Sequence, residues 1–201
     1  MTLFIKFFLL IYFIIFFGIA FFGTSFFVAK KIGKNPNVLP NDDSAYGLIG
    51  KYFKINLITV FLYVILLSFG SLEFENKYLK TTYFDSNNLK IFGIILMIFS
   101  LICVIIAQIN MKESWRIGID KEVKTELILS GLFKYSRNPI FLGMTLSLAG
   151  LFLVSSNCIT LIFLIVGCIL MQIQIRLEEE FLQKTHGKLY IEYKNNVRRM
   201  L

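Results

Sequence analysis

Residues 140–175 read IFLGMTLSLAGLFLVSSNCITLIFLIVGCILMQIQI, an apolar stretch interrupted near its middle by Ser155, Ser156 and Asn157. A helix needs about 20 mostly apolar residues to cross the roughly 30 Å hydrocarbon core of a bilayer. About 36 apolar residues with one polar break therefore predict two helices that form a tight hairpin. Pro139 precedes the first helix, where its fixed φ and missing N–H suit the first turn.

Three more apolar runs lie upstream, at about residues 7–29, 55–72 and 89–109. The first is too long for the core of a signal peptide, so we expect it to be retained in the membrane. Together with the hairpin, these runs predict an all-α, polytopic membrane helix bundle of about five transmembrane helices, with four or six as the neighbouring counts. We expect residues 1–124 to form the N-terminal transmembrane helices and loops. Residues 125–201 would form a C-terminal helical hairpin and cytoplasmic tail, all in one structural unit.

The composition excludes a soluble domain. Of 201 residues, 56% are hydrophobic and 17% charged, and the mean hydropathy is +0.70, which is more apolar surface than one soluble core buries. The net charge of +8 would suggest nucleic acid in a soluble chain. Here the cations gather at residues 30–54, 112–137 and 176–199, which a five-helix count puts on one face. Because basic loops stay in the cytoplasm, we expect the N-terminus outside, the C-terminus inside and no nucleic-acid partner.

The sequence predicts no metal site. The three cysteines, Cys103, Cys158 and Cys168, lie in apolar runs without a CxxC spacing, and we interpret them as small core residues. The single histidine, His186, has no cysteine or second histidine near it in the sequence.

A first polar cluster lies just before the hairpin, where residues 125–143 read TELILSGLFKYSRNPIFLG. Gly131 permits a turn that a side chain would resist, and Pro139 begins the next helix. Arg137 and Asn138 are thereby held at the membrane surface. An ordinary loop leading into a helix, with an arginine that reaches toward water, explains this run equally well.

A second polar cluster follows the hairpin at Arg176, Glu178, Glu179 and Glu180. Anions are disfavoured near a helix C-terminus, so a cationic partner would offset their cost. The alternative is a solvated face with Arg176 and Lys184 as exposed partners. Because successive helical residues point about 100° apart, one of Glu178 and Glu179 can face the bundle while the other faces the adjoining loop.

The two clusters around the hairpin resemble the isoprenylcysteine carboxyl methyltransferases and their relatives, the phospholipid methyltransferases. The family pattern is a glycine and an aromatic residue, Arg-His/Asn-Pro-x-Tyr/Phe-x-Gly, two helices, Glu-Glu-x-x-Leu, a Phe-Gly-x-x-Tyr-x-x-Tyr run and a Val-Pro-Arg-like end. The matching positions here are Gly131, Phe133, residues 137–143, Glu178, Glu179, Leu182, Gly187, Tyr190, Tyr193 and residues 197–199.

The resemblance implies an S-adenosylmethionine-dependent methyltransferase that acts on a lipophilic small molecule or lipid taken from the bilayer, at the cytoplasmic face. Residues 125–201 would then be its catalytic region. Arg137 or Arg176 would orient an anionic acceptor or the methionine carboxylate. The cofactor-binding residues implied by the resemblance are Thr125, Glu126, Leu127, Ile128, Phe133, Asn138, Pro139, Ile140, Phe141, Glu178 and Glu179.

Four positions depart from the commoner family pattern: Asn138, Gln174, His186 and Arg198. Gln174 stands where eukaryotic members have an arginine implicated in binding the substrate carboxylate. Phosphatidylethanolamine N-methylation and small-thiol S-methylation therefore stay open beside carboxyl O-methylation. A non-catalytic membrane subunit and an NADPH-dependent sterol-type reductase are further alternatives, although Met144 stands where the reductases have glutamate. The sequence leaves the oligomeric state open.

Overall fold

We describe the computed structural model over residues 2–40, 42–70, 86–118 and 126–200. Within these ranges the chain is all-α, apart from an isolated bridge between Asn37 and Ile117. Thr125, one of the expected cofactor residues, lies outside the described residues.

The first helical segment is continuous from Leu3 to Ile32. Helix α1 (Leu3–Phe17) passes through a π-helical turn, η1 (Gly18–Gly23), into α2 (Thr24–Ile32). Two short 3-10 turns, η4 (Lys112–Ser114) and η5 (Gly131–Lys134), lie further along the chain. The remaining helices are α3 (Ala45–Phe69), α5 (Asn87–Met111), α6 (Pro139–Val154), α7 (Cys158–His186) and α8 (Lys188–Asn196).

Four helical segments are long and apolar enough to cross a membrane, as expected for a multi-pass integral membrane protein: Leu3–Ile32, Ala45–Phe69, Asn87–Ser114 and Cys158–His186. Helix α6 has 16 residues and rises about 24 Å, which is shorter than the roughly 30 Å hydrocarbon core. Of the five expected spans, four are helices of membrane-spanning length, whereas the fifth, α6, is a shorter apolar helix. Large apolar side chains point outward from the bundle, including Phe22, Phe27 and Phe69.

The predicted hairpin is confirmed. Helix α6 ends at Val154 and α7 begins at Cys158, so the break falls at the three polar residues between them. The side chain of Asn157 caps α7, because its Oδ1 accepts hydrogen bonds from the backbone N–H groups of Ile159 and Thr160, each at 3.0 Å. The hydroxyl of Thr160 completes a capping box with the N–H of Asn157.

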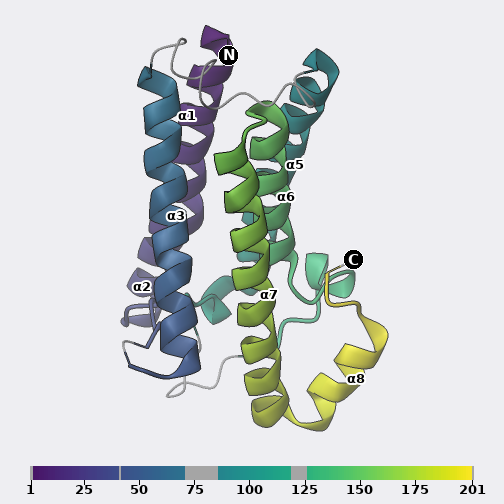
Figure 1. The fold of residues 1–201 in the computed structure, drawn as a ribbon. Helices are drawn as coiled ribbons and strands as arrows, with labels where there is room; N and C mark the ends of the chain where they lie inside the picture. Colours follow the sequence, from purple (N-terminus) through teal and green to yellow (C-terminus); the bar gives the residue numbers. More distant parts are fainter. Residues whose placement is uncertain (1, 41, 71–85, 119–125, 201) are drawn as a thin grey trace.

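Helices α5 and α6 pack closely side by side (Figure 1). A Cβ placed on Gly150 would lie 2.4 Å from Cγ of Met97 and 2.8 Å from the carbonyl oxygen of Gly93, so only glycine allows this approach. Hydrogen bonds among three buried hydroxyl groups connect α1 to α5 and α6. The Tyr12 hydroxyl lies 3.0 Å from Ser100 Oγ of α5 and 2.9 Å from Ser147 Oγ of α6.

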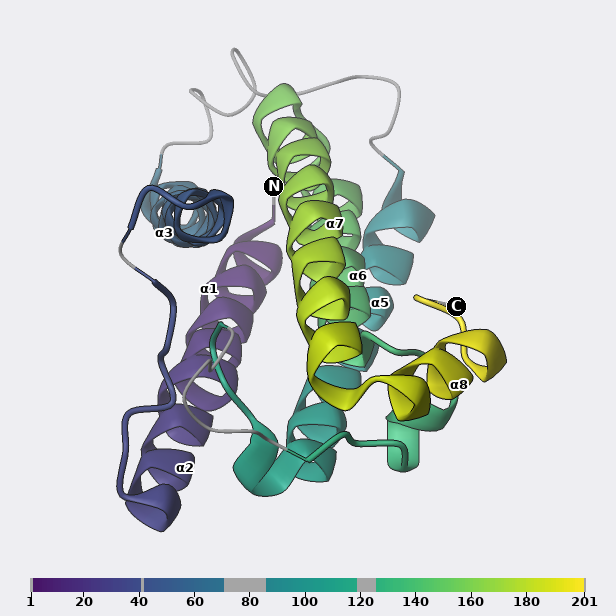
Figure 2. The same ribbon diagram turned by 90° about the horizontal axis from the view of Figure 1, so that it is seen from below.

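One end of the bundle carries the polar connections. There α2, α5 and α7 finish and α3 and α6 begin, while the N-terminus lies at the opposite end (Figure 1). We call it the charged end, because the three basic segments of the sequence meet there. Seen from this end, α8 folds back from α7 toward the segment around η5 (Figure 2). The described cations of the charged end include Lys30, Lys31, Lys34, Lys51, Lys54, Lys112, Arg116, Lys134, Arg137, Arg176 and Lys184.

Candidate functional site

The loop before α6 is anchored on the end of α5. Asn110 Oδ1 accepts a hydrogen bond of 3.1 Å from the backbone N–H of Leu132. Gly131 has φ +63°, and a Cβ there would lie 2.0 Å from the same Oδ1 atom, so this turn requires glycine. Gly131 begins η5, which directs Phe133 into the protein, where its side chain is buried.

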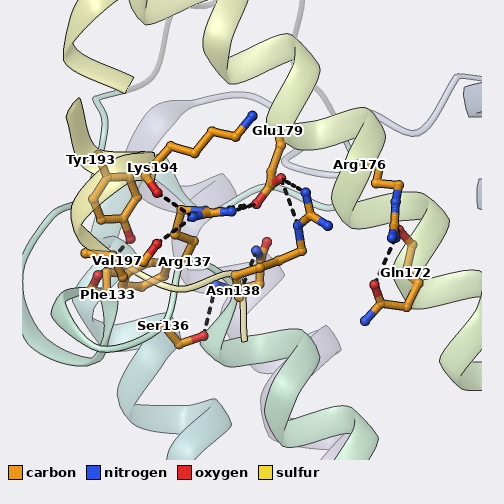
Figure 3. A network of polar contacts seen from close by, with 11 residues as sticks. Phe133, Ser136, Arg137, Asn138, Gln172, Arg176, Glu179, Tyr193, Lys194 and Val197 are labelled. Carbon is orange, nitrogen blue, oxygen red and sulfur yellow. Dashed lines mark hydrogen bonds and ion pairs between the residues drawn. The ribbon is translucent and has the colours of Figure 1, made fainter. Parts of the chain in front are cut away.

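Glu179 is held between two arginines (Figure 3). Its Oε1 accepts from Nε of Arg137 at 2.9 Å and lies 2.8 Å from Nη2 of the same side chain. Its Oε2 accepts from Nε and Nη2 of Arg199 at 3.0 and 2.8 Å. Only 6% of the Glu179 side chain and 7% of the Arg137 side chain are exposed. The carboxylate is therefore buried, and both its oxygens are paired in forked geometry.

The C-terminal tail is tied to the same loop. The backbone N–H of Arg137 donates to the carbonyl of Arg198 at 2.9 Å, and Asn138 Nδ2 donates to the carbonyl of Arg199 at 3.0 Å. Nη1 of Arg137 reaches the carbonyls of Lys194, at 2.9 Å, and Val197. We call Arg137, Glu179, Arg199 and these backbone contacts the clamp. It joins the loop before α6, the end of α7 and the tail.

Tyr193 supports the clamp from α8. Its hydroxyl donates a hydrogen bond of 2.7 Å to the carbonyl of Phe133. Burial raises the pKa of Tyr193 to about 12, despite the opposing effect of the nearby Arg137. Burial and the nearby Glu179 also raise the pKa of Tyr190. Both phenols therefore stay protonated at neutral pH, and Tyr193 keeps its donor.

A pocket opens among the helices at the charged end. Its cavity volume is about 180 Å³, which is smaller than the roughly 300–1,000 Å³ of typical small-molecule sites. Its walls come from both halves of the chain. Side chains that line it include Phe16, Phe21, Phe53, Trp115, Arg116, Phe133, Arg137, Asn138, Pro139, Ile140, Phe141, Met144, Gln174, Glu178 and Leu182.

Glu178 and Gln174 form the polar part of this pocket. Gln174 Nε2 donates to the hydroxyl of Tyr46 at 2.8 Å and to Oε1 of Glu178 at 3.2 Å. Gln174 is only 5% exposed, and its Oε1 is buried with no hydrogen-bond partner among the described residues. Among the described residues, no ion pair includes Glu178. The pocket thus presents the Glu178 carboxylate, which accepts hydrogen bonds from a cationic group, with the buried Gln174 beside it.

The expected site residues fall into three groups. The pocket brings together Phe133, Arg137, Asn138, Pro139, Ile140, Phe141 and Glu178. Glu179 belongs to the clamp instead. The described residues Glu126, Leu127 and Ile128 are not among the pocket-lining residues.

Arg176 lies away from the pocket. It is exposed, and Nη1 donates to the carbonyl and to Oε1 of Gln172, one turn earlier on the same helix, at 2.7 and 2.9 Å (Figure 3). It borders a separate polar surface depression that also includes Glu180 and Lys184. The structure therefore does not bring Arg176 together with Glu178.

Sequence reasoning missed several pocket residues. Phe16 and Phe53 come from α1 and α3, and nothing local distinguishes them from the chain's other phenylalanines. Gln174 did carry a signal, because it is polar, lies within an apolar run and stands one turn before Glu178. In the described part of the chain, no group of His, Cys, Asp and Glu is arranged to hold a metal ion.

Comparison with known proteins places this arrangement in a family. The family model described as phospholipid methyltransferase matches residues 89–189, just over half of the chain. The match runs from α5 to the start of α8, so it includes η5, the hairpin and both Glu178 and Glu179. A search of curated proteins finds no match. The chain belongs to the phospholipid methyltransferase family, a family of S-adenosylmethionine-dependent membrane enzymes that includes isoprenylcysteine carboxyl methyltransferase-like members.

Proposed function

We propose that this chain transfers a methyl group from S-adenosylmethionine to a lipophilic carboxylate at the cytoplasmic face of a membrane. The observation that carries the proposal is the pocket with Glu178 and Gln174 in its wall. Its polar groups lie at the charged end of the bundle, and aromatic side chains from the membrane helices α1 and α3 complete its lining.

The cofactor fits the polar part of the pocket. S-adenosylmethionine supplies an electrophilic methyl group on a sulfonium, and its methionine part carries an ammonium with three N–H donors. The Glu178 carboxylate accepts such donors and balances positive charge. Phe133 and Phe141 offer aromatic surface to a cation or to a flat ring. The apolar walls exclude water, which in-line methyl transfer requires more than a covalent intermediate.

The charge distribution supports a cytoplasmic orientation for the pocket. With five spans, counting the shorter α6, the N-terminus is outside and all three basic segments are inside. Cofactor from the cytosol then enters at the charged end, while acceptor enters from the bilayer.

A carboxylate acceptor suits the side chains of the pocket. A carboxylate is already ionised at neutral pH and needs no general base, whereas an amine or a thiol needs to lose a proton. Glu178 is the only carboxylate among the described pocket residues, and in this proposal it holds the cofactor. Arg116 lines the same pocket and brings positive charge to it, while its Nη1 donates to the backbone carbonyls of Glu113 and Trp115 at 2.6 and 2.8 Å. Arg137 lines it as well, but its guanidinium is paired with Glu179 and acts as a positioning group.

The test is methyl transfer by the purified protein in lipid nanodiscs with methyl-labelled S-adenosylmethionine. Parallel reactions contain a prenylated N-acetylcysteine, phosphatidylethanolamine or a long-chain thiol. We expect label in a base-labile methyl ester of the prenylated carboxylate. Label on the amine of phosphatidylethanolamine or on the sulfur of the thiol would instead identify that group, and not the carboxylate, as the methyl acceptor. A folded sample that binds neither S-adenosylmethionine nor S-adenosylhomocysteine in calorimetry would contradict the proposal, and NADPH oxidation with a sterol substrate would favour a reductase.

A further inference from the structure

A groove lies on the outside of the bundle, between the first helical segment and α5. Its cavity volume is about 480 Å³, which is within the roughly 300–1,000 Å³ of small-molecule sites. Among the described residues, Gln108 alone lines both this groove and the pocket. Both flanking segments are long enough to span a membrane, and Phe27 and Ile109 in the groove walls are 72% and 65% exposed. The groove, which we call the outer groove, therefore opens to the hydrocarbon of the membrane.

Two glycines leave the space of the outer groove. Gly18 and Gly23 are the first and last residues of the π-helical turn η1, and because π-helical hydrogen bonds join residues five apart, the two glycines lie on one face. A Cβ built on Gly18 would meet no atom within 4 Å, and one built on Gly23 would meet the carbonyl oxygen of Gly18 at 3.1 Å. No other described side chain takes the place of the two that are missing, so the space is left open to the membrane.

The outer groove is apolar at one end and cationic at the other. Gly18 and Ile19 line the apolar end, whereas Lys31, Lys112 and Glu113 line the end that belongs to the charged end of the bundle. Thirteen residues separate Gly18 from Lys31, which is about 20 Å of helix. Lys31 pairs with Glu113 at 2.7 Å. In the described part of the chain, no hydrogen bond or ion pair includes the ammonium of Lys112.

The polar side chains between these two ends bond to each other and to the backbone. Gln108 Nε2 donates to the carbonyl of Ala20 at 2.6 Å, and the hydroxyl of Thr24 donates to Gln108 Oε1 at 3.1 Å. These hydrogen bonds join the first helical segment to α5. Because they already use the polar groups at this level, a hydrocarbon chain in the outer groove displaces no hydrogen bond.

The backbone of Lys112 has a conformation that a lysine disfavours. Its φ is 49° and its ψ is −122°, and no other non-glycine residue among those described has a positive φ. Glycine adopts this region of backbone conformation at much lower cost. A lysine at this position therefore calls for an explanation outside the folding of the chain, and its unpaired ammonium lies at the cationic end of the outer groove.

We infer that the outer groove binds an anionic phospholipid from the leaflet at the charged end, with one acyl chain along η1 and α2 and its phosphate at Lys112. Charge complementarity selects this head group, since one lysine near an anionic lipid surface contributes about fivefold in affinity. The bound lipid stays outside the pocket that contains Glu178, so it is a bound component of the protein and not the methyl acceptor. The inference does not depend on the proposed function.

The probes are phosphatidylglycerol and phosphatidylcholine with identical acyl chains, in equal amounts in nanodiscs that contain the purified protein. Native mass spectrometry of the released protein identifies the lipids that it retains. We expect one retained lipid, with about a fivefold preference for phosphatidylglycerol. Lys112→Gln removes the charge, so the preference disappears. Lys51→Gln is the matched control, because Lys51 is exposed at the same end of the bundle and does not line the outer groove.

Equal retention of the two lipids by the wild type would overturn the inference, and so would a preference that survives in Lys112→Gln. Lys112→Gly relieves the backbone strain, so we expect a melting temperature a few degrees higher together with loss of the preference. A lower melting temperature for Lys112→Gly with an unchanged lipid preference would assign Lys112 to the fold alone.

Gly18→Leu tests the apolar end of the outer groove. A side chain at Gly18 enters open space and replaces glycine within a helix, so we expect no fall in melting temperature, while retention of both lipids falls. Phe22→Leu is the control, because Phe22 is 75% exposed in the same turn and does not line the outer groove. Unchanged retention in Gly18→Leu would contradict the inference. A dimer that disappears in Gly18→Leu, or transferred methyl label on the retained lipid, would also overturn it, in favour of a second copy of the chain or of the methyl acceptor.

Discussion

Two adjacent glutamates on α7 have the same side chain and opposite surroundings. Glu179 faces the loop and the tail, where two arginines pair both of its oxygens and leave 6% of the side chain exposed. Glu178 faces the pocket, where Gln174, at 3.2 Å, is its one hydrogen-bond partner within the described part of the chain. Rotation by about 100° per residue turns neighbouring side chains into two different regions, the clamp and the pocket.

The difference shows that the role of a buried carboxylate depends on how many of its hydrogen-bonding positions are already filled by protein groups. A buried carboxylate with four charged hydrogen-bond contacts has no capacity left for a ligand, so Glu179 holds the structure together. Glu178, with one neutral partner among the described residues, keeps the capacity to accept hydrogen bonds from a ligand. Changing each glutamate separately tests this division, because stability and ligand affinity respond differently.

The largest effect is expected from Glu179→Ala. Removing the carboxylate leaves the buried Arg137 guanidinium without its counter-charge, which costs about 3–5 kcal/mol of unfolding free energy. Thermal unfolding of the purified protein in detergent measures the loss. Glu179→Gln is the companion variant, since it keeps the shape and removes the charge. Wild-type stability in Glu179→Ala would place the clamp outside the folded core.

The next effect is a loss of affinity at Glu178. Hydrogen bonds to a charged group contribute about 1.5–3 kcal/mol, so Glu178→Ala should weaken S-adenosylhomocysteine binding roughly 10- to 100-fold. We expect no fall in melting temperature, because Glu178 has no ion pair among the described residues. Calorimetry on both proteins is the measurement. Unchanged affinity would remove Glu178 from the cofactor site, and a large loss of stability would make it a structural residue like Glu179.

A smaller effect is expected from Arg199→Ala. The arginine side chain is 35% exposed and Glu179 keeps Arg137, so the loss should be about 1 kcal/mol after solvent screening. The backbone bonds from Arg137 and Asn138 to the tail remain. Limited proteolysis of the C-terminus, with melting temperature, reports the change. If Arg199→Ala destabilises as much as Glu179→Ala, both arginines are indispensable to the clamp.

The smallest effect is expected at Glu180, the third carboxylate of the run. Its ion pair with Lys184, at 2.6 Å, is exposed to solvent on both sides. Glu180→Ala should leave both melting temperature and cofactor affinity unchanged, and it serves as the size-matched control for the other two glutamates. A measurable change in either melting temperature or cofactor affinity would show that Glu180 also contributes to the fold or to the cofactor site.

Much of this arrangement was predictable from local sequence. The hairpin follows from Ser155, Ser156 and Asn157 inside a long apolar run, and the structure ends and starts its helices around them. The division between Glu178 and Glu179 was also expected in outline, because it depends only on helical geometry. The pairing of Glu179 with Arg137 was not, since 42 residues separate the two side chains.

By itself, the sequence determined the apolar spans, the break between α6 and α7 and the gathering of basic segments at one end. Each of these depends on residues that are neighbours along the chain. Only the tertiary structure decided which glutamate is paired with two arginines and which phenylalanines line the pocket. Phe16 and Glu178 are more than 150 residues apart, yet they line one pocket. The reason is physical: helix periodicity fixes the faces of each helix, whereas packing between helices decides which faces meet.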